Sequence, residues 1–99
     1  MTEHDIIYND ALNTWGHDAQ MDVAIEELSE LIKAIIKYRR NPSEDTAFNM
    51  ADELGDVTIM MRQLEISMMR KHPDFACWRD GNMKIKLNRV RKMLSKNQP

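Results

Sequence analysis

The chain has 99 residues, 42% of them hydrophobic and 30% charged, a composition typical of one globular domain spanning residues 1–99. No run approaches the roughly 20 apolar residues that a membrane crossing needs, and the first charged residues are acidic where a signal peptide would be basic. We therefore expect a cytoplasmic protein with no membrane partner. One cysteine and three scattered histidines exclude an internal disulfide and a Cys/His zinc cluster.

Charge is divided unevenly along the chain, although the net charge is only −2. Residues 1–74 hold fifteen acids and seven bases, whereas residues 75–99 hold one acid and seven bases, so the two parts carry −8 and +6. The basic part could bind nucleic acid, neutralise the acidic remainder, or hold a polyanionic ligand between the two. A chain this short buries proportionally little surface, which also favours association with a second copy.

Few glycines and prolines, with many helix-forming residues, predict an all-α fold with four helices. The first helix is expected over residues 3–15, with Thr2 as its N-cap and Gly16 as its stop. Apolar residues recur along it at helical spacing, namely Ile7, Ala11 and Trp15.

The next two helices are predicted to form an antiparallel hairpin. A long amphipathic helix begins near residue 18 and ends at the Asn-Pro-Ser break of residues 41–43. Ser43 or Asp45 can open the third helix, which continues to about residue 71 because a proline follows.

Residues 72–81 are predicted to form a connector, since they contain one proline and end at Gly81. The last helix follows, with an apolar seam made of Met83, Leu87, Val90 and Leu94. Beside the seam lies a basic stripe with helical spacing, which consists of Lys84, Asn88 and Arg91. Its two cations and one amide could contact phosphates, although such a stripe taken alone is more often a solvated face.

Two pairs of carboxylates occupy mirrored positions in the predicted hairpin. Glu27 and Glu30 share one face of the second helix, and Glu53 and Asp56 share one face of the third. The midpoint of Glu30 and Glu53 is 41.5, and the midpoint of Glu27 and Asp56 is also 41.5, within the break. Because a helix rises about 1.5 Å per residue, the four carboxylates would lie at matching heights and could converge on one spot.

Most glutamates spaced three apart on a helix are simply solvated, and Glu26 fits that description. Glu27 and Asp56 differ, because apolar residues flank each of them one turn away. Four carboxylates held close together would repel one another and take up protons unless a cation paired with them. With no histidine or cysteine at supporting spacing, the all-oxygen ligand set favours Mg²⁺ or Mn²⁺.

The pattern Glu26-Glu27-x-x-Glu30, followed by Glu53-x-x-Asp56, resembles the signature of the MazG-like, all-α nucleoside triphosphate pyrophosphohydrolases. The similarity covers most of residues 10–92, including Trp15-Gly16, Gln20, residues 24–37 and 49–64, and the basic stripe. It implies a MazG-like helical bundle that works as a homodimer or homotetramer. It also implies that Mg²⁺ is held by Glu27, Glu30, Glu53 and Asp56.

The activity that this resemblance implies is hydrolysis of a nucleoside triphosphate between its α and β phosphates, which releases a monophosphate and pyrophosphate. The four acids would then be catalytic as well as metal-binding, with Glu30 or Glu27 orienting or deprotonating the attacking water. Lys84, Asn88 and Arg91 would contact the phosphates. Trp15 and Gln20 are candidates for binding the base, whose identity the sequence leaves open.

Two other functions fit the same residues. A non-catalytic helical module could bind nucleotides, or bind nucleic acid through the last helix, although nucleic acid is not the partner that we expect. A related pyrophosphohydrolase could act on a phosphoribosyl nucleotide with the same metal chemistry. A panel of substrates would separate these alternatives.

Overall fold

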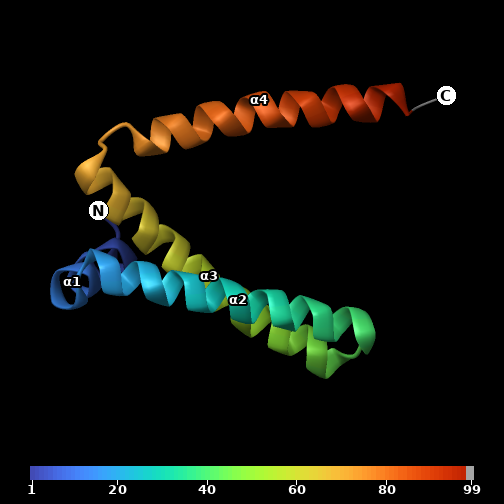
Figure 1. The fold of residues 1–99 in the computed structure, drawn as a ribbon, viewed down its shortest axis with the longest axis horizontal. Coiled ribbons are helices and arrows are strands. Elements are labelled where there is room, and N and C mark those ends of the chain that lie inside the picture. Colours follow the sequence, from blue (N-terminus) through green and yellow to red (C-terminus); the bar gives the residue numbers. More distant parts are fainter. Residues whose placement is uncertain (98–99) are drawn as a thin grey trace. The chain divides into compact units, whose positions relative to one another are not determined.

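The structure is a computed structural model that describes residues 1–97. This part of the chain contains no strand and forms four helices, which are α1 (Glu3–Trp15), α2 (His17–Arg40), α3 (Glu44–Lys71) and α4 (Phe75–Lys96) (Figure 1). The predicted all-α fold class is therefore confirmed. None of these helices combines the length and the apolar character that a bilayer crossing requires.

The chain divides into two compact units, Met1–Ser67 and Met68–Pro99. The first unit contains α1, α2 and most of α3, and the second contains the last turn of α3 together with α4. Fourteen of the sixteen acids belong to the first unit, whereas nine of the fourteen bases belong to the second. The charge asymmetry of the sequence thus follows the division of the fold.

Both ends of α1 form as predicted. The Thr2 hydroxyl accepts a hydrogen bond of 3.0 Å from the backbone N–H of Asp5, and Gly16 ends the helix with a φ of 94°, a conformation that glycine adopts readily. Leu12 is the buried residue of α1, whereas Ile7 and Trp15, two of the apolar residues at helical spacing, are exposed. The inward face is the one that carries Asp5, which lies seven residues before Leu12 and accepts hydrogen bonds from Arg62 of α3.

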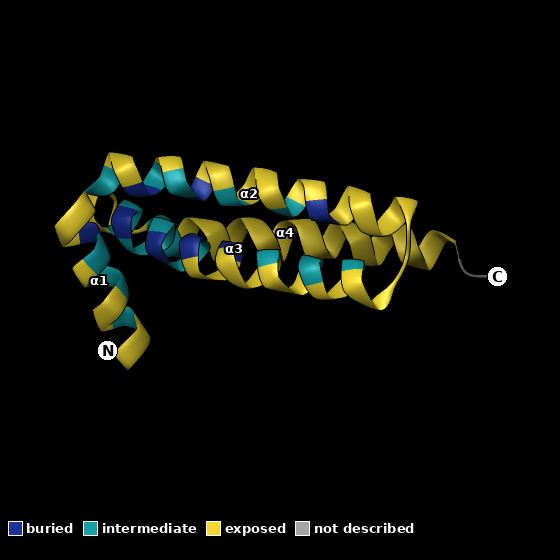
Figure 2. Ribbon diagram, turned by 90° about the horizontal axis from the view of Figure 1, so that it is seen from below, coloured by how far each residue is buried: buried dark blue, intermediate teal, exposed yellow. Residues whose placement is uncertain are grey.

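Helices α2 and α3 form the predicted antiparallel hairpin and lie side by side along their length (Figures 1 and 2). Ser43, one of the two residues expected to open the third helix, caps α3. Its hydroxyl accepts from the backbone N–H of Thr46 at 3.1 Å, and the Thr46 hydroxyl accepts from the backbone N–H of Ser43 at the same distance. This reciprocal pair is a capping box, which fixes where α3 begins and so where the chain reverses.

Along α2 and along α3, one stripe of residues spaced alternately three and four apart is buried or half-buried (Figure 2). We call these two stripes the seam. On α2 the seam consists of His17, Gln20, Ala24, Glu27, Leu31 and Ala34, and on α3 of Thr46, Met50, Glu53, Val57, Met60, Leu64 and Ser67. Alternating spacings of three and four residues are those of a heptad pattern, in which two helices pack closely along their length.

A buried polar pair fixes the register of the hairpin. The Gln20 Nε2 group donates a hydrogen bond of 2.6 Å to Gln63 Oε1, and both residues are buried. One turn further, His17 Nδ1 and the Ser67 hydroxyl are also hydrogen-bonded. The midpoint of residues 20 and 63 is 41.5, the same value about which the carboxylates mirror. The register on which the predicted carboxylate cluster depends is therefore the one that the fold adopts.

The predicted connector over residues 72–81 is too long, because α4 begins at Phe75. The backbone N–H of Trp78 already donates to the carbonyl of Asp74 at 3.0 Å, so Gly81 lies inside the helix. A glycine within a helix costs only about 1 kcal/mol relative to alanine, which its helix-forming neighbours outweigh. The predicted apolar seam of α4 is present but exposed, at Met83, Leu87, Val90 and Leu94.

Replacing Gln63 with alanine is expected to lower the free energy of unfolding by about 1–3 kcal/mol, because the Gln20 amide then stays buried without its partner. Urea denaturation followed by circular dichroism measures the change. Replacing Gln20 and Gln63 together with leucine removes both polar groups and should restore most of the loss. Unchanged stability of Gln63→Ala would contradict the role of this pair in setting the register.

Candidate metal centre

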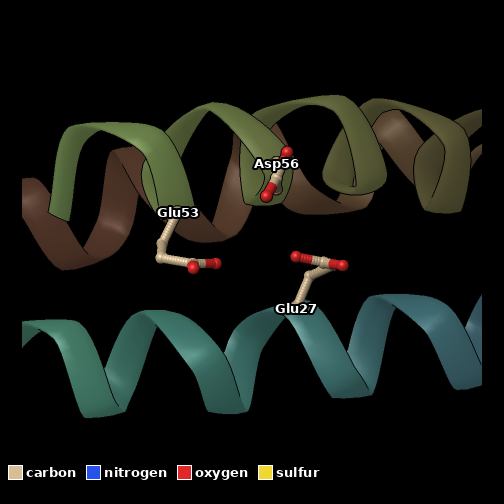
Figure 3. A group of neighbouring side chains, drawn as sticks. All are labelled: Glu27, Glu53 and Asp56. Atoms are coloured by element: carbon tan, nitrogen blue, oxygen red, sulfur yellow. The ribbon is translucent and has the colours of Figure 1, made fainter. Parts of the chain in front are cut away.

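Three of the four predicted carboxylates meet between α2 and α3. One oxygen from each of Glu27, Glu53 and Asp56 lies within 4.8 Å of the others. Figure 3 shows Glu27 extending from α2 and Glu53 extending from α3 into the same space, with Asp56 close by on α3. Glu27 and Glu53 are half-buried and Asp56 is exposed, so the acidic cluster formed by these three residues is open to solvent on one side.

Glu27 and Glu53 occupy seam positions that packing alone would give to apolar residues. Glu27 lies in the same stripe as Ala24 and Leu31, and Glu53 in the same stripe as Val57. Burying part of an ionised side chain costs free energy unless a partner or a cation compensates it. The stability of the hairpin therefore does not explain why these two positions are acidic.

The acids of the cluster disfavour one another's ionisation. Partial burial raises the pKa of Glu27 above its usual value of 4.5, and the negative charges of Asp56 and Glu53 raise it further. Partial burial likewise raises the pKa of Glu53, as does the charge of Asp56, whereas the positive charge of Lys37 lowers it. A divalent cation at this point would offset the repulsion and hold the carboxylates ionised.

Glu30, the fourth predicted ligand, stands outside the group of three. Its carboxylate oxygen Oε1 lies 3.5 Å from Lys33 Nζ in an ion pair within α2, and both side chains are largely exposed. Its charge nevertheless contributes to raising the pKa of Glu27 and of Glu53, so it lies near the cluster. The predicted set is thus present as three gathered acids and one at their edge.

The donor set of the cluster fits a hard cation such as Mg²⁺ or Mn²⁺. All three donors are carboxylates, and neither sulfur nor imidazole contributes, which is unlike the ligand sets that hold zinc. Magnesium binds oxygen at about 2.0–2.1 Å, so two opposite ligands stand about 4.2 Å apart. The donor atoms of the cluster lie within 4.8 Å of one another, and small side-chain rotations can bring them to the spacing that magnesium requires.

The other predicted binding residues have different surroundings, each described within its own unit. Gln20 is buried in the seam, where its amide is bonded to Gln63 and positions the helices. Trp15, at the end of α1, is 65% exposed. The stripe on α4 is exposed and belongs to the second unit, where it consists of Lys84, Asn88 and Arg91.

Sequence reasoning missed two sets of residues around the cluster. The structural role of Gln20 and Gln63 was readable from their shared midpoint of 41.5, the same signal that identified the acids. The lysines beside the cluster, Lys33 and Lys37, follow Glu30 at spacings of three and seven residues, which place them on its side of the helix.

Comparisons of the chain with protein-family models, with curated proteins and with solved structures found no match. The resemblance to the MazG-like pyrophosphohydrolases therefore rests on the motif residues, and membership of that family stays a prediction. The geometry of the acidic cluster stands independently of that resemblance.

Without divalent cations, the acidic cluster should make the hairpin less stable as the pH rises. The folded-state pKa values of Glu27 and Glu53 lie above the ordinary value of 4.5, so the folded state binds these protons more tightly than the unfolded state does. Their contribution to stability is complete below about pH 4.5 and is lost as the pH rises through the raised values.

Replacing Glu27 with glutamine removes its share of this effect. In EDTA near pH 7 we expect Glu27→Gln to melt at a higher temperature than the natural protein, with a difference that shrinks toward pH 4. Melting curves between pH 4 and 8 measure this, and Glu26→Gln, at an exposed position outside the seam, is the matched control. A lower melting temperature of Glu27→Gln throughout that range would show that the carboxylate stabilises the fold instead.

Proposed function

We propose that this protein is a Mg²⁺-dependent nucleoside triphosphate pyrophosphohydrolase of the MazG-like type, which cleaves between the α and β phosphates. The observation that carries the proposal is the acidic cluster of Glu27, Glu53 and Asp56, whose donor atoms lie within 4.8 Å of one another. Two of these acids occupy seam positions where they cost stability, which a bound cation would explain. The resemblance of both motifs to the family supports the same conclusion.

Each residue of the proposed site has a distinct role. Glu27, Glu53 and Asp56 would hold the metal, which when bound polarises phosphoryl oxygens and lowers the pKa of a coordinated water. Glu30 stands at the edge of the cluster, where a carboxylate oxygen can take a proton from the attacking water, and Glu27 is the alternative base. No side-chain nucleophile is needed, and the nearby Ser29 hydroxyl instead donates to the backbone carbonyl of Glu26 at 2.7 Å.

Phosphate binding in this proposal also uses Lys84, Asn88 and Arg91, the exposed stripe on α4. Cations and an amide along one side of a helix suit the several oxygens of a polyphosphate. Trp15 remains a candidate for stacking on the base because it is exposed.

Association into a homodimer or homotetramer is part of the proposal. Large apolar side chains recur at helical spacing on a second face of α2, where they are exposed, namely Ile25, Leu28, Ile32 and Ile35. Exposed apolar side chains in such a row are typical of an interface between protein chains.

One observation favours a second candidate function, a non-catalytic module that binds polyanions. Helix α4 carries seven bases and one acid, and none of its residues is buried. Nucleic-acid binding through such a helix would weaken steeply as salt concentration rises. Salt-dependent binding of DNA or RNA, with no turnover of any nucleotide, would favour this candidate over the enzyme.

The enzyme is tested by incubating the protein with each NTP and dNTP in Mg²⁺. We expect release of pyrophosphate and a nucleoside monophosphate, and no release in EDTA. Replacing Glu53 with glutamine removes one metal ligand and should lower the rate by about 100-fold or more. Glu26→Gln, which changes the charge equally outside the cluster, should keep the activity within about threefold.

Two results would contradict the proposal. Unchanged pyrophosphate release by Glu53→Gln would show that the cluster is not the catalytic centre. Release of orthophosphate in place of pyrophosphate would show that a different anhydride bond is broken. Circular dichroism of Glu53→Gln distinguishes loss of activity from loss of fold.

A further inference from the structure

A pair of lysines continues the side of α2 on which Glu30 stands. Lys33 Nζ lies 3.5 Å from Glu30 Oε1. Lys37 follows Glu30 by seven residues, so it points within about 20° of the same direction around the helix. Lys33 and Lys37 are four residues apart on α2, about one turn, and Glu30, which Lys33 contacts, lies at the edge of the acidic cluster.

The ion pair of Lys33 with Glu30 and the direction of Lys37 around α2 distinguish these two among the five bases of the first unit. Arg62 is held by Asp5 and Glu65. Arg39 points about 180° away from Glu30 around α2, and Arg40 about 80° away. The positive charge of Lys37 also lowers the pKa of the Glu53 carboxyl.

Charge balance shows why the metal centre needs bases beside it. Three carboxylates and one Mg²⁺ together carry a net charge of −1, and Glu30 adds a further negative charge nearby. A polyphosphate brings several more negative charges, so the acids and the metal alone would repel it. The two ammonium groups bring the summed charge of the three acids, the metal and Glu30 from −2 to zero without occupying coordination positions on the metal.

We infer that Lys33 and Lys37 bind phosphate oxygens of the polyphosphate that the metal centre receives, an inference that rests on the proposed function. A lysine is a compact charge on a flexible stem, which suits a phosphate oxygen that approaches from solvent. When Lys33 turns to a phosphate, it releases Glu30, whose carboxylate is then free to turn toward the cluster. The ion pair between Glu30 and Lys33 is thus the arrangement without polyphosphate, and the two groups separate when polyphosphate binds.

The test separates binding of the metal from binding of the phosphates. Titrating Mg²⁺ alone into the protein by calorimetry gives the affinity of the acidic cluster. Titrating inorganic tripolyphosphate at saturating Mg²⁺ gives the affinity for the loaded polyphosphate. The variants are Lys33→Ala and Lys37→Ala, with Lys37→Arg as the conservative variant. Arg39→Ala is the matched control, since it removes one positive charge from the opposite side of the same helix.

The two titrations should respond differently to the lysine variants. Each lysine variant should bind Mg–tripolyphosphate about tenfold more weakly, while its affinity for Mg²⁺ alone stays equal or increases because a repelling charge is gone. Lys37→Arg should regain most of the affinity, and Arg39→Ala should resemble the natural protein in both titrations.

The outcomes that overturn the inference differ from those that overturn the function. If the natural protein binds Mg²⁺ and releases pyrophosphate but the lysine variants match Arg39→Ala, the lysine site is refuted and the function stands. If the natural protein binds neither Mg²⁺ nor Mg–tripolyphosphate, both are refuted. If the lysine variants lose affinity for Mg²⁺ and for Mg–tripolyphosphate equally, the lysines support the fold of the cluster and do not bind phosphate.

Discussion

The hydrogen bond between Gln20 and Gln63 is the interaction on which the arrangement of the first unit depends. Small and apolar side chains fill most of the seam and would pack nearly as well if one helix slid along the other. Two buried amides do not allow this, because each loses its partner when the register changes. Glu27 and Asp56 share the midpoint of the glutamines, so the register that pairs the amides also brings the acids together.

The position of the cluster along the hairpin could be predicted because it depends on two local quantities. One is the constant rise of an α-helix, and the other is the position of the break, which Ser43 and Thr46 fix by capping each other. The inward face of α1 could not be predicted in the same way. It is set by contact between Asp5 and Arg62, which are 57 residues apart in the sequence, and no periodicity within α1 reveals it.

The exclusion of Glu30 from the group of three has a simple geometric cause. Mirrored residue numbers give the height of a side chain along the hairpin but not its direction around the helix. Glu27 belongs to the seam, and Glu30 lies about 60° away from it around α2, on the flank where Lys33 competes for its carboxylate. The sequence contains this information, but it becomes decisive only when the inward direction of each helix is known.

The acidic cluster is open to solvent, which suits a metal site that also receives a substrate better than a site for a permanently enclosed structural ion. A magnesium ion prefers six oxygen ligands, and the three carboxylates of the cluster leave positions for water and phosphate oxygens. Asp56 is exposed, so these positions face solvent on the side where a guest can arrive. A structural cage would instead close around its ion and compensate Glu27 and Glu53 permanently. In the proposed site the half-buried acids would be compensated only while a cation is bound, which would couple the stability of the hairpin to loading of the site.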